Sequence, residues 1–328
     1  MAKYLIYGAG GIGGVIGHRL ARAGCEVTLI ARGEHAAVMK TQGLRVVDWQ
    51  GSSVQQLRVE QHPRDVAIDD ETFVLMCMKS QHHESALQDL SKVATPETRV
   101  VCVQNGVANE RTALRYFEHV IATVVNLPTS FLTPGEVVTY AKGSEGILDS
   151  GCYPSGLDAH ARQYCADLEQ AGFRAVPDDQ VMRKKYAKLL MNLGNVFQAL
   201  VTHPRSEFAV ELQRAARREA LQAFSAAGID CADRGEIADA NEDVFETVDV
   251  PGYPRTGGSS WQSLARGTGD IETEFLNGEI ALLARLQGLT APVNALMVAL
   301  SRQVIATGTG PQSLDEAALR RAYEGAAR

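Results

Sequence analysis

The sequence predicts an α/β protein in which a doubly wound parallel sheet is followed by an all-helical C-terminal domain. Through the first half of the chain, short β-rich runs alternate with helical patterns, which is typical of a parallel sheet with helices on both faces. A glycine-rich turn, Gly8–Gly13, follows the first of these runs. The second half has helical periodicity and no strand pattern above noise.

The predicted strands of the first domain begin with Lys3–Tyr7 and include one fully apolar run, Phe73–Met78. The other strands are expected at Glu26–Ala31, Leu44–Trp49, Val54–Val59, Arg99–Gln104, His119–Val125, Val137–Tyr140, Gly146–Leu148 and Arg174–Val176. The last three should close the same sheet, and Leu44–Trp49 should form a hairpin with Val54–Val59. Helices are expected at Ile12–Ala23, His35–Gln42, Ser80–Leu90 and Asp158–Ala171.

A turn-forming cluster, Pro177-Asp178-Asp179, marks the change from alternating strand and helix patterns to helical patterns alone. We therefore expect two domains, residues 1–178 and 179–328. Helices of the second domain are expected at Val181–Val201, Glu207–Ala227, Asp233–Val248, Ile271–Leu286, Pro292–Thr307 and Asp315–Ala327. Between them, Asp249–Ser260 is rich in glycine, proline and serine, which predicts a mobile loop. We take as a hypothesis that this loop closes as a lid.

Composition excludes several classes of protein. With 45% hydrophobic and 22% charged residues in 328, the chain is globular rather than disordered. A net charge of −7 argues against binding to nucleic acid. We expect no membrane span and no signal peptide, because no apolar run approaches about 20 residues. The six cysteines form no C-x-x-C motif, so we expect no metal site and a reduced, cytoplasmic protein.

The glycine-rich turn is the first candidate binding site. It runs Gly8-Ala9-Gly10-Gly11-Ile12-Gly13, a G-x-G-x-x-G pattern between a predicted strand and a predicted helix. Gly8 allows the tight turn, Gly10 lets the backbone approach a pyrophosphate, and Gly13 lets helix and strand pack closely. We therefore interpret the first domain as a Rossmann-type dinucleotide-binding domain, although a glycine-rich turn without a ligand would look the same.

The end of the second strand bears on the choice between NAD and NADP. NAD-binding domains usually carry an acidic residue there for the ribose 2′-hydroxyl. This chain has Arg32 instead, and an arginine offers bidentate donors to a 2′-phosphate. The sequence therefore favours NADP(H), and the alternative is a solvated surface arginine.

Two further polar residues end predicted strands of the sheet. Lys79 follows Phe73–Met78, and Asn105 follows Arg99–Gln104. Ligands of open α/β sheets bind outside the carboxyl ends of the strands, so both are candidates for cofactor contacts. A surface lysine and a turn-forming Asn-Gly pair are the alternative interpretations.

A lysine and two amides should share one face of the first helix of the second domain. At about 100° per residue, Lys188, Asn192 and Asn195 project together among apolar neighbours. The alternative is a lysine that snorkels to solvent, with both amides in interhelical hydrogen bonds. Lys184 and Lys185 on the same helix are expected to be ordinary surface charges.

A second polar cluster follows the predicted loop. Ser260 lies at a loop-to-helix junction, where it suits either a helix N-cap or a ligand carboxylate. Glu272 belongs to an acidic stretch that also fits a helix N-terminus. The adjacent His82 and His83 point in different directions, so we expect them to be solvent-exposed and not to bind a metal.

These motifs, in this order and spacing, resemble the ketopantoate reductases (2-dehydropantoate 2-reductases), and the resemblance covers nearly the whole chain. It rests on Gly8–Gly13, Lys79, Gln104-Asn105-Gly106, the helix of Lys188 and Asn192, and Ser259-Ser260 followed by Glu272 and Leu276-Asn277-Gly278. It implies an NADPH-dependent reduction of 2-dehydropantoate to pantoate, on the route through pantothenate to coenzyme A.

The resemblance also implies roles for individual residues. Lys188 would be the proton donor, with Asn192 and Ser260 as substrate contacts and Glu272 near both the lysine and the cofactor. Lys79 and Asn105 would contact the cofactor, and Asn105 would also approach the substrate.

The chain departs from the family pattern at the second asparagine, which usually follows the lysine by eight residues. Val196 stands at that position and Asn195 precedes it, so we expect Asn195 to substitute. This departure motivates one alternative, an NADP-dependent reductase of another 2-oxo acid or of a related carbonyl or imine. Another alternative is a regulatory protein that senses NADPH without turnover. Fold-level analogy alone suggests a homodimer.

Overall fold

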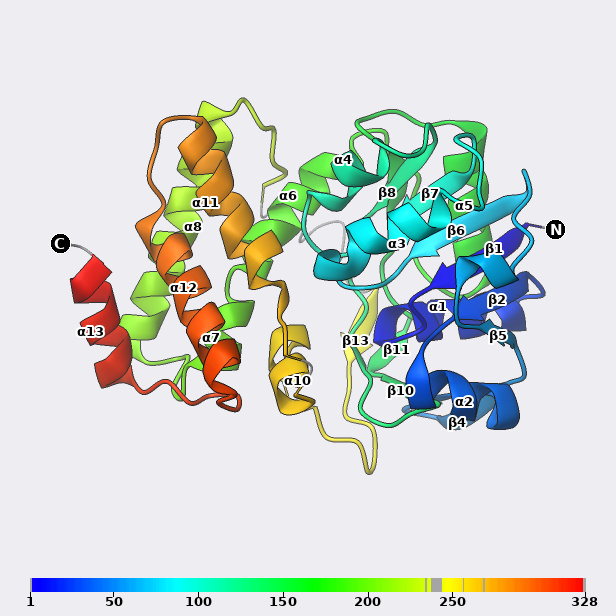
Figure 1. Cartoon of the computed structure of the whole chain (residues 1–328), viewed down its shortest axis with the longest axis horizontal. Helices are drawn as coiled ribbons and strands as arrows, with labels where there is room; N and C mark the ends of the chain where they lie inside the picture. The colour runs from blue at the N-terminus through cyan, green and yellow to red at the C-terminus, as the bar shows by residue number, and fades with distance from the viewer. Residues whose placement is uncertain (1, 234, 237–243, 256, 268, 327–328) are drawn as a thin grey trace. The chain divides into compact units, whose positions relative to one another are not determined.

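The computed structural model describes residues 2–233, 235–236, 244–255, 257–267 and 269–326. The chain divides into two compact units (Figure 1). Unit 1 comprises Met1–Lys185 and Asp233–Arg255, and unit 2 comprises Tyr186–Ala232 and Thr256–Arg328. The change from unit 1 to unit 2 thus falls within a helix, a few residues after the expected boundary at residue 178. No helix in the described part of the chain has the length and apolar character needed to cross a membrane.

The main sheet of unit 1 has seven strands in the order β12-β8-β7-β6-β1-β2-β5. Their bounds are β1 Lys3–Tyr7, β2 Glu26–Ile30, β5 Arg58–Glu60, β6 Thr72–Met76, β7 Arg99–Cys102, β8 Val120–Thr123 and β12 Ser150–Cys152. All neighbouring strands are parallel except β12, which is antiparallel to β8. This arrangement confirms the predicted α/β class with an open parallel sheet.

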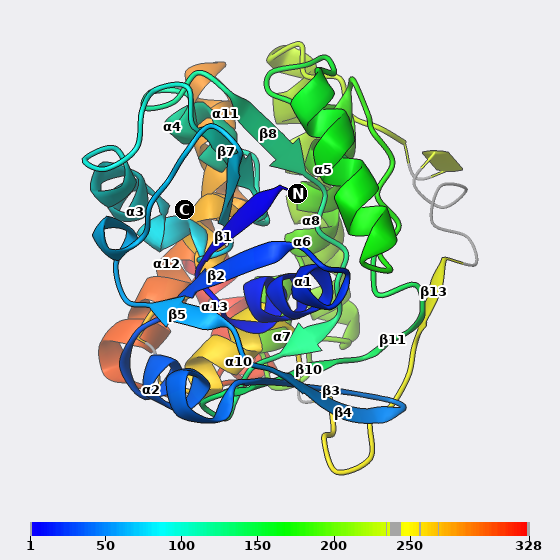
Figure 2. The same cartoon turned by 90° about the vertical axis from the view of Figure 1, so that its right-hand side faces the viewer.

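Alternate residues of each strand serve the two faces of this sheet. Tyr4 and Ile6 belong to a core cluster with residues of α1 and α5, whereas Leu5 and Tyr7 belong to a second cluster with residues of α3. Figure 2 shows α1 and α5 on one side of the strands and α3 and α4 on the other. The helices of unit 1 are α1 Gly11–Arg22, α2 Gly33–Gln42, α3 His83–Leu90, α4 Asn109–Ala113 and α5 Ala159–Gln170, with 3₁₀ turns η1 Pro63–Asp65 and η2 Ser80–His82.

A separate four-stranded sheet has the order β4-β3-β10-β9, formed by β3 Leu44–Asp48, β4 Gly51–Gln55, β9 Thr129–Ser130 and β10 Glu136–Thr139. The predicted hairpin is present as β3 and β4, but its second strand begins at Gly51 and ends at Gln55, and Arg58 and Val59 belong to β5 of the main sheet. The prediction that 137–140 closes the main sheet is wrong, because β10 pairs with β3 and β9 instead. Strand propensity marks a segment as extended but does not choose its partner.

Unit 2 has a helical core, as predicted. Its helices are α7 Asn195–Leu200, α8 Glu207–Ala226, α10 Ser259–Ala265, α11 Asn277–Leu286, α12 Pro292–Thr307 and α13 Glu316–Ala326, with the 3₁₀ turn η3 Glu272–Phe275. Figure 1 shows α8, α11 and α12 side by side, and each packs against the other two. Two predicted helices are interrupted. α6, Val181–Asn192, ends before Gly194, and the helix predicted at Ile271–Leu286 is divided into η3 and α11.

A returning segment adds a strand to unit 1. β13, Phe245–Thr247, pairs antiparallel with β11, Ala141–Gly143, so the predicted helix Asp233–Val248 is wrong at its end. Residues 237–243 of that prediction lie outside the described residues. Beyond β13, Val250 is buried against the small sheet and the Tyr253 hydroxyl donates to Glu136 at 3.0 Å. Residues 249–255 thus form an irregular segment of unit 1 that is held at Val250 and Tyr253, residue 256 lies outside the described residues, and Ser259–Ser260 of the predicted loop begin α10.

Candidate active site

Four loops of unit 1 begin at one edge of the main sheet. The parallel register places Tyr7 beside Ile30 and Met76, and Met76 beside Cys102, so β1, β2, β6 and β7 end level with one another. The residues that follow these ends are Gly8, Arg32, Lys79 and Asn105. The strand register thus brings together the loops that carry the cofactor-side residues predicted in unit 1.

The structure explains the glycine-rich turn position by position. Gly8 has φ +103°, and a Cβ there would lie 2.8 Å from the Met78 backbone nitrogen. A Cβ on Gly13 would lie 2.3 Å from the Gly8 carbonyl oxygen, so strand and helix could not pack. At Gly10, by contrast, the nearest atom to a Cβ is a Phe131 ring carbon at 3.8 Å. The fold itself does not require glycine at position 10, whereas a closely approaching ligand would.

The start of α1 offers backbone donors on the same turn. Gly10 is the N-cap, so no side chain caps the helix, and the first turn has no acidic residue. Its first amides therefore remain available to an anion, and the helix dipole favours negative charge there. Together with the open space at Gly10, this fits a dinucleotide pyrophosphate.

His35 holds the glycine-rich turn in place, a role that the sequence analysis missed. Its Nε2 donates to the Ala9 carbonyl at 2.7 Å, and its Nδ1 accepts from the Gly135 amide at 2.8 Å. Burial lowers the pKa of the imidazole, which suits a ring whose Nδ1 must stay unprotonated. The ring also packs on Phe131, with 4.4 Å between centroids.

Arg32 is exposed directly after β2. Burial raises the pKa of the Tyr7 phenol, and the positive charge of Arg32 opposes this rise, so the guanidinium lies near the end of β1. The arginine is therefore accessible beside the glycine-rich turn, as a 2′-phosphate contact requires. A solvated surface arginine would have the same exposure.

A buried polar network fixes the loops of Lys79 and Asn105. The Gln104 amide donates to the Met78 carbonyl at 2.9 Å and to His83 Nδ1 at 3.2 Å. His83 Nε2 donates to the Asn109 carbonyl at 3.0 Å, and the Asn109 amide donates to the Asn105 carbonyl at 3.0 Å. Both loops are therefore tied to one another through side chains.

His83 is 1% exposed, so the prediction that it faces solvent is wrong, whereas His82 is exposed. The pKa of His83 is lowered to about 4, and burial is the main cause. From the sequence alone, two adjacent histidines predict an exposed pair. The Asn109 carbonyl and the Gln104 side-chain amide that satisfy His83 come from residues more than 20 positions away.

The remaining predicted residues lie in unit 2. Lys188 is partly exposed on α6, and Asn192, one turn later, is 7% exposed. The Asn192 Nδ2 has no hydrogen-bond partner among the residues that the structure describes. Ser260 and Glu272 are buried on α10 and η3. A buried amide with an unused donor is a candidate for a substrate contact.

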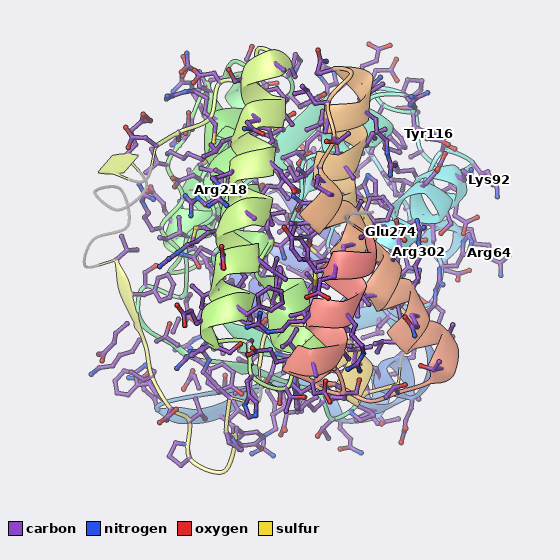
Figure 3. The ribbon with its side chains drawn as sticks, turned by 90° about the vertical axis from the view of Figure 1, so that its left-hand side faces the viewer. Arg64, Lys92, Tyr116, Arg218, Glu274 and Arg302 are labelled. Atoms are coloured by element: carbon purple, nitrogen blue, oxygen red, sulfur yellow. The ribbon has the colours of Figure 1, made fainter. Side chains whose placement is uncertain are left out.

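Contacts within unit 2 connect the elements that carry these residues. α10 packs against α7, and the Asn277 amide at the start of α11 donates to the Leu193 carbonyl at 3.3 Å, just beyond Asn192. Figure 3 shows Arg302 beside Glu274, whose carboxylate it binds through two nitrogens at 2.5 and 2.9 Å. This pair ties η3, which carries Glu272, to α12.

Asn195 lies beyond the end of the helix that carries Lys188 and Asn192. The α6 helix ends at Asn192, and Asn195 begins α7 after the Gly194 N-cap. The periodicity continued through Gly194, but the backbone does not. Val196 is 1% exposed in the core of unit 2.

The expectation that Lys184 and Lys185 are ordinary surface charges is wrong. Lys184 Nζ lies 2.9 Å from Asp149 and 2.8 Å from Asp178. Lys185 is buried in an ion pair with Glu110. In the described part of the chain, no three histidine, cysteine or acidic residues are grouped as a metal site would require.

Comparison with known families places both parts of the chain. The family model described as ketopantoate reductase PanE/ApbA matches residues 4–154, and its C-terminal counterpart matches residues 180–305. A 2-dehydropantoate 2-reductase of Archaeoglobus fulgidus is 28% identical over 306 residues, covering 91% of this chain and 96% of that protein. Its counterpart in Pyrococcus horikoshii is 26% identical over 318 residues, covering 94% and 99%.

Solved structures with the same fold include a PanE/ApbA family ketopantoate reductase from Ralstonia eutropha. It has a TM-score of 0.79 at 28% identity and covers 94% of this chain and 99% of that one. A ternary structure of D-mandelate dehydrogenase with NADH and anilino(oxo)acetate has a TM-score of 0.78 at 21% identity, covering 93% and 99%. At this lower identity the second likeness shows the fold alone.

His83→Gln should weaken the acid sensitivity of the fold. The pKa of His83 is about 4 in the folded chain against an ordinary 6.5, so below pH 6.5 the unfolded chain binds a proton that the folded chain does not. Stability therefore falls as the pH falls towards 4. Urea titrations at pH 7 and 4.5 should show a loss of unfolding free energy that is smaller by roughly 2 kcal/mol in the variant.

The matched control is His82→Gln, which changes the exposed neighbour and should retain the wild-type pH dependence. Identical losses in all three proteins would show that His83 is not kept neutral by its surroundings.

Proposed function

We propose that this chain, which belongs to the ketopantoate reductase PanE/ApbA family, reduces 2-dehydropantoate to pantoate with NADPH. The observation that carries the proposal is that Lys188 and Asn192 lie one turn apart on α6. The buried Asn192 Nδ2 has no hydrogen-bond partner among the described residues. A cation and an unused amide donor, one turn apart, suit a substrate that carries a ketone beside a carboxylate. The names of the curated relatives support the same substrate.

Residues of unit 1 fit the cofactor. Gly10 leaves space for a pyrophosphate, and the uncapped amides at the start of α1 would bind its oxygens. Arg32 would bind the 2′-phosphate, which is the support for NADPH over NADH. Lys79 and Asn105 would contact the cofactor from the neighbouring strand ends, and Asn105 would also face the substrate.

When bound, NADPH supplies the hydride that reduces the ketone. The chain's own groups then control the charge and the proton. Lys188 holds a proton at Nζ, stabilises the negative charge that develops on the carbonyl oxygen, and delivers the proton to it. Asn192 and Ser260 orient the substrate by hydrogen bonds, with Asn195 as a further contact. Glu272 balances the charge of the lysine and contacts the cofactor.

A second candidate substrate class is another 2-oxo acid, and one observation favours it. Val196, at the position of the family's second asparagine, is buried with Phe197 and Leu200 in the core of unit 2, so it offers the substrate no amide. A substrate with fewer polar groups than 2-dehydropantoate would need no such contact. A sensor without turnover would not need Lys188, Asn192 and Glu272. We also propose a homodimer, by analogy with a Staphylococcus aureus ketopantoate reductase described as dimeric.

The test of substrate is NADPH oxidation at 340 nm with 2-dehydropantoate and with a panel of other 2-oxo acids. The proposal expects kcat/KM above about 10⁴ M⁻¹s⁻¹ for 2-dehydropantoate, a normal value for an enzyme on its own substrate. Higher efficiency with another member of the panel would establish the second candidate. Tight NADPH binding without turnover on any of them would establish the sensor.

Lys188→Met should reduce kcat by about 10²–10⁴-fold, the usual contribution of a positioned acid or base. The side chain keeps its length and loses its proton and charge, so the NADPH dissociation constant, measured by fluorescence titration, should change less than about threefold. Lys92→Met, at an exposed lysine of unit 1, is the control and should behave as the wild type. Turnover near that of the wild type in Lys188→Met would refute the assignment.

Arg32→Ala should weaken NADPH binding by roughly tenfold or more, because it removes charge-assisted hydrogen bonds to the 2′-phosphate. NADH lacks that phosphate, so its dissociation constant should change less than about twofold. Arg64→Ala removes another exposed arginine of unit 1 and should affect neither cofactor. An equal loss for NADPH and NADH in Arg32→Ala would remove the support for NADP specificity.

A further inference from the structure

Helix α6 belongs to both units of the chain. It begins at Val181 in unit 1, the division between the units falls after Lys185, and Lys188 follows one turn later. A helix rises about 1.5 Å per residue, so Lys185 and Lys188 are about 4.5 Å apart along its axis. A contact that fixes the first half of the helix therefore also restricts the backbone of Lys188, the residue assigned as proton donor.

Lys185 is held by three acceptors at once. Its Nζ lies 2.6 Å from Glu110 Oε1 and donates to the carbonyls of Gln104 at 3.0 Å and Thr123 at 3.1 Å. The ammonium group thus uses two of its three donors in hydrogen bonds to backbone carbonyls, and its contact with Glu110 is an ion pair. The lysine side chain is 3% exposed and the glutamate side chain 0%. Protein atoms thus fix the position of the ammonium group.

The two carbonyls lie at the edge of the sheet where the candidate cofactor loops begin. Thr123 ends β8, and Gln104 follows β7 directly before Asn105. The Gln104 side chain in turn donates to the carbonyl of Met78, the residue before Lys79. One ammonium group therefore ties α6 to the loop of Asn105, and through Gln104 to the loop of Lys79.

A gain in stability does not by itself explain why Lys185 and Glu110 form a buried ion pair. Taking both charges out of water is costly, and well-packed apolar residues in place of a buried ion pair are often as stable or more so. What apolar residues cannot reproduce is the direction of the two hydrogen bonds to these backbone carbonyls. A displacement of about 1 Å in a reacting group can reduce the rate about 100-fold, so such direction matters in an active site.

We propose that Lys185 and Glu110 form a positioning pair that fixes the unit 1 end of α6, the helix that also carries Lys188, to the ends of β7 and β8. The inference rests on the proposed function, because it takes Lys188 as the proton donor. Lys185 itself acts through two backbone carbonyls and through the helix, and its side chain is buried. It is therefore a positioning residue and not a catalytic one.

The first test is the double variant Lys185→Met with Glu110→Leu. It removes both charges, so the fold should keep a Tm near that of the wild type. The positioning proposal expects kcat to fall about 10- to 100-fold while the NADPH dissociation constant changes less than about threefold. A double variant with wild-type Tm and a kcat within about twofold of the wild type would overturn the proposal.

Lys185→Arg is the second variant, in case the double variant does not fold. It keeps the charge opposite Glu110, but a planar guanidinium cannot place the same two hydrogen bonds beside the ion pair. Positioning expects kcat to fall by about fivefold or more at unchanged Tm, whereas a purely charge-balancing lysine predicts wild-type kcat and would overturn the proposal. Lys184→Met is the matched control on the same helix, since its ion pairs with Asp149 and Asp178 do not involve the strand-end carbonyls.

A measurement without substrate separates this inference from the proposed function. Hydrogen–deuterium exchange of residues 103–110 should be faster in the Lys185 variants than in the wild type and in Lys184→Met. Exchange of residues 120–125 should be faster in the Lys185 variants than in the wild type. If the wild type does not turn over 2-dehydropantoate, the proposed function fails, and the exchange result still decides the inference. Unchanged exchange in folded Lys185 variants would overturn it whatever the substrate.

Discussion

The hydrogen-bond register of β2, β1, β6 and β7 is the constraint on which the candidate site of unit 1 depends. Because these strands are parallel and in step, Ile30, Tyr7, Met76 and Cys102 lie level, and the loops that follow them start at one edge. The same edge exposes irregular backbone whose carbonyls have no partner strand. The structure satisfies several of these carbonyls with buried side chains, among them His35, His83 and Lys185.

His35 and His83 meet this need in the same way. Each donates from Nε2 to a loop carbonyl and accepts at Nδ1, so each must be neutral and in one tautomer. Lys185 meets it differently, because an ammonium only donates and brings a charge that Glu110 must balance. Neutral rings therefore join loop to loop, while the charged pair joins the helix α6 to the sheet.

The sequence predicted the α/β class, the glycine-rich turn and the helix of Lys188, since each depends on periodicity or on a local backbone requirement. It misjudged Lys185 and His83, because their burial depends on acceptors at Thr123 and Asn109 that are distant along the chain. It also continued α6 through Gly194, where apolar periodicity persists although the helix stops. Strand partners, such as that of β10, depended on pairing energies that no single segment contains.

The pairing of β11 with β13 has a consequence for the order in which the protein can fold on the ribosome. Lys142 and Glu246 face each other across about a hundred residues of chain, so closing this pair carries a loop-closure cost that adjacent strands avoid. Synthesis proceeds from the N-terminus, and the docked segment through residue 255 emerges only after α6, α7 and α8. Unit 1 is therefore completed by residues made after part of unit 2, and no contiguous fragment of the gene encodes either unit alone.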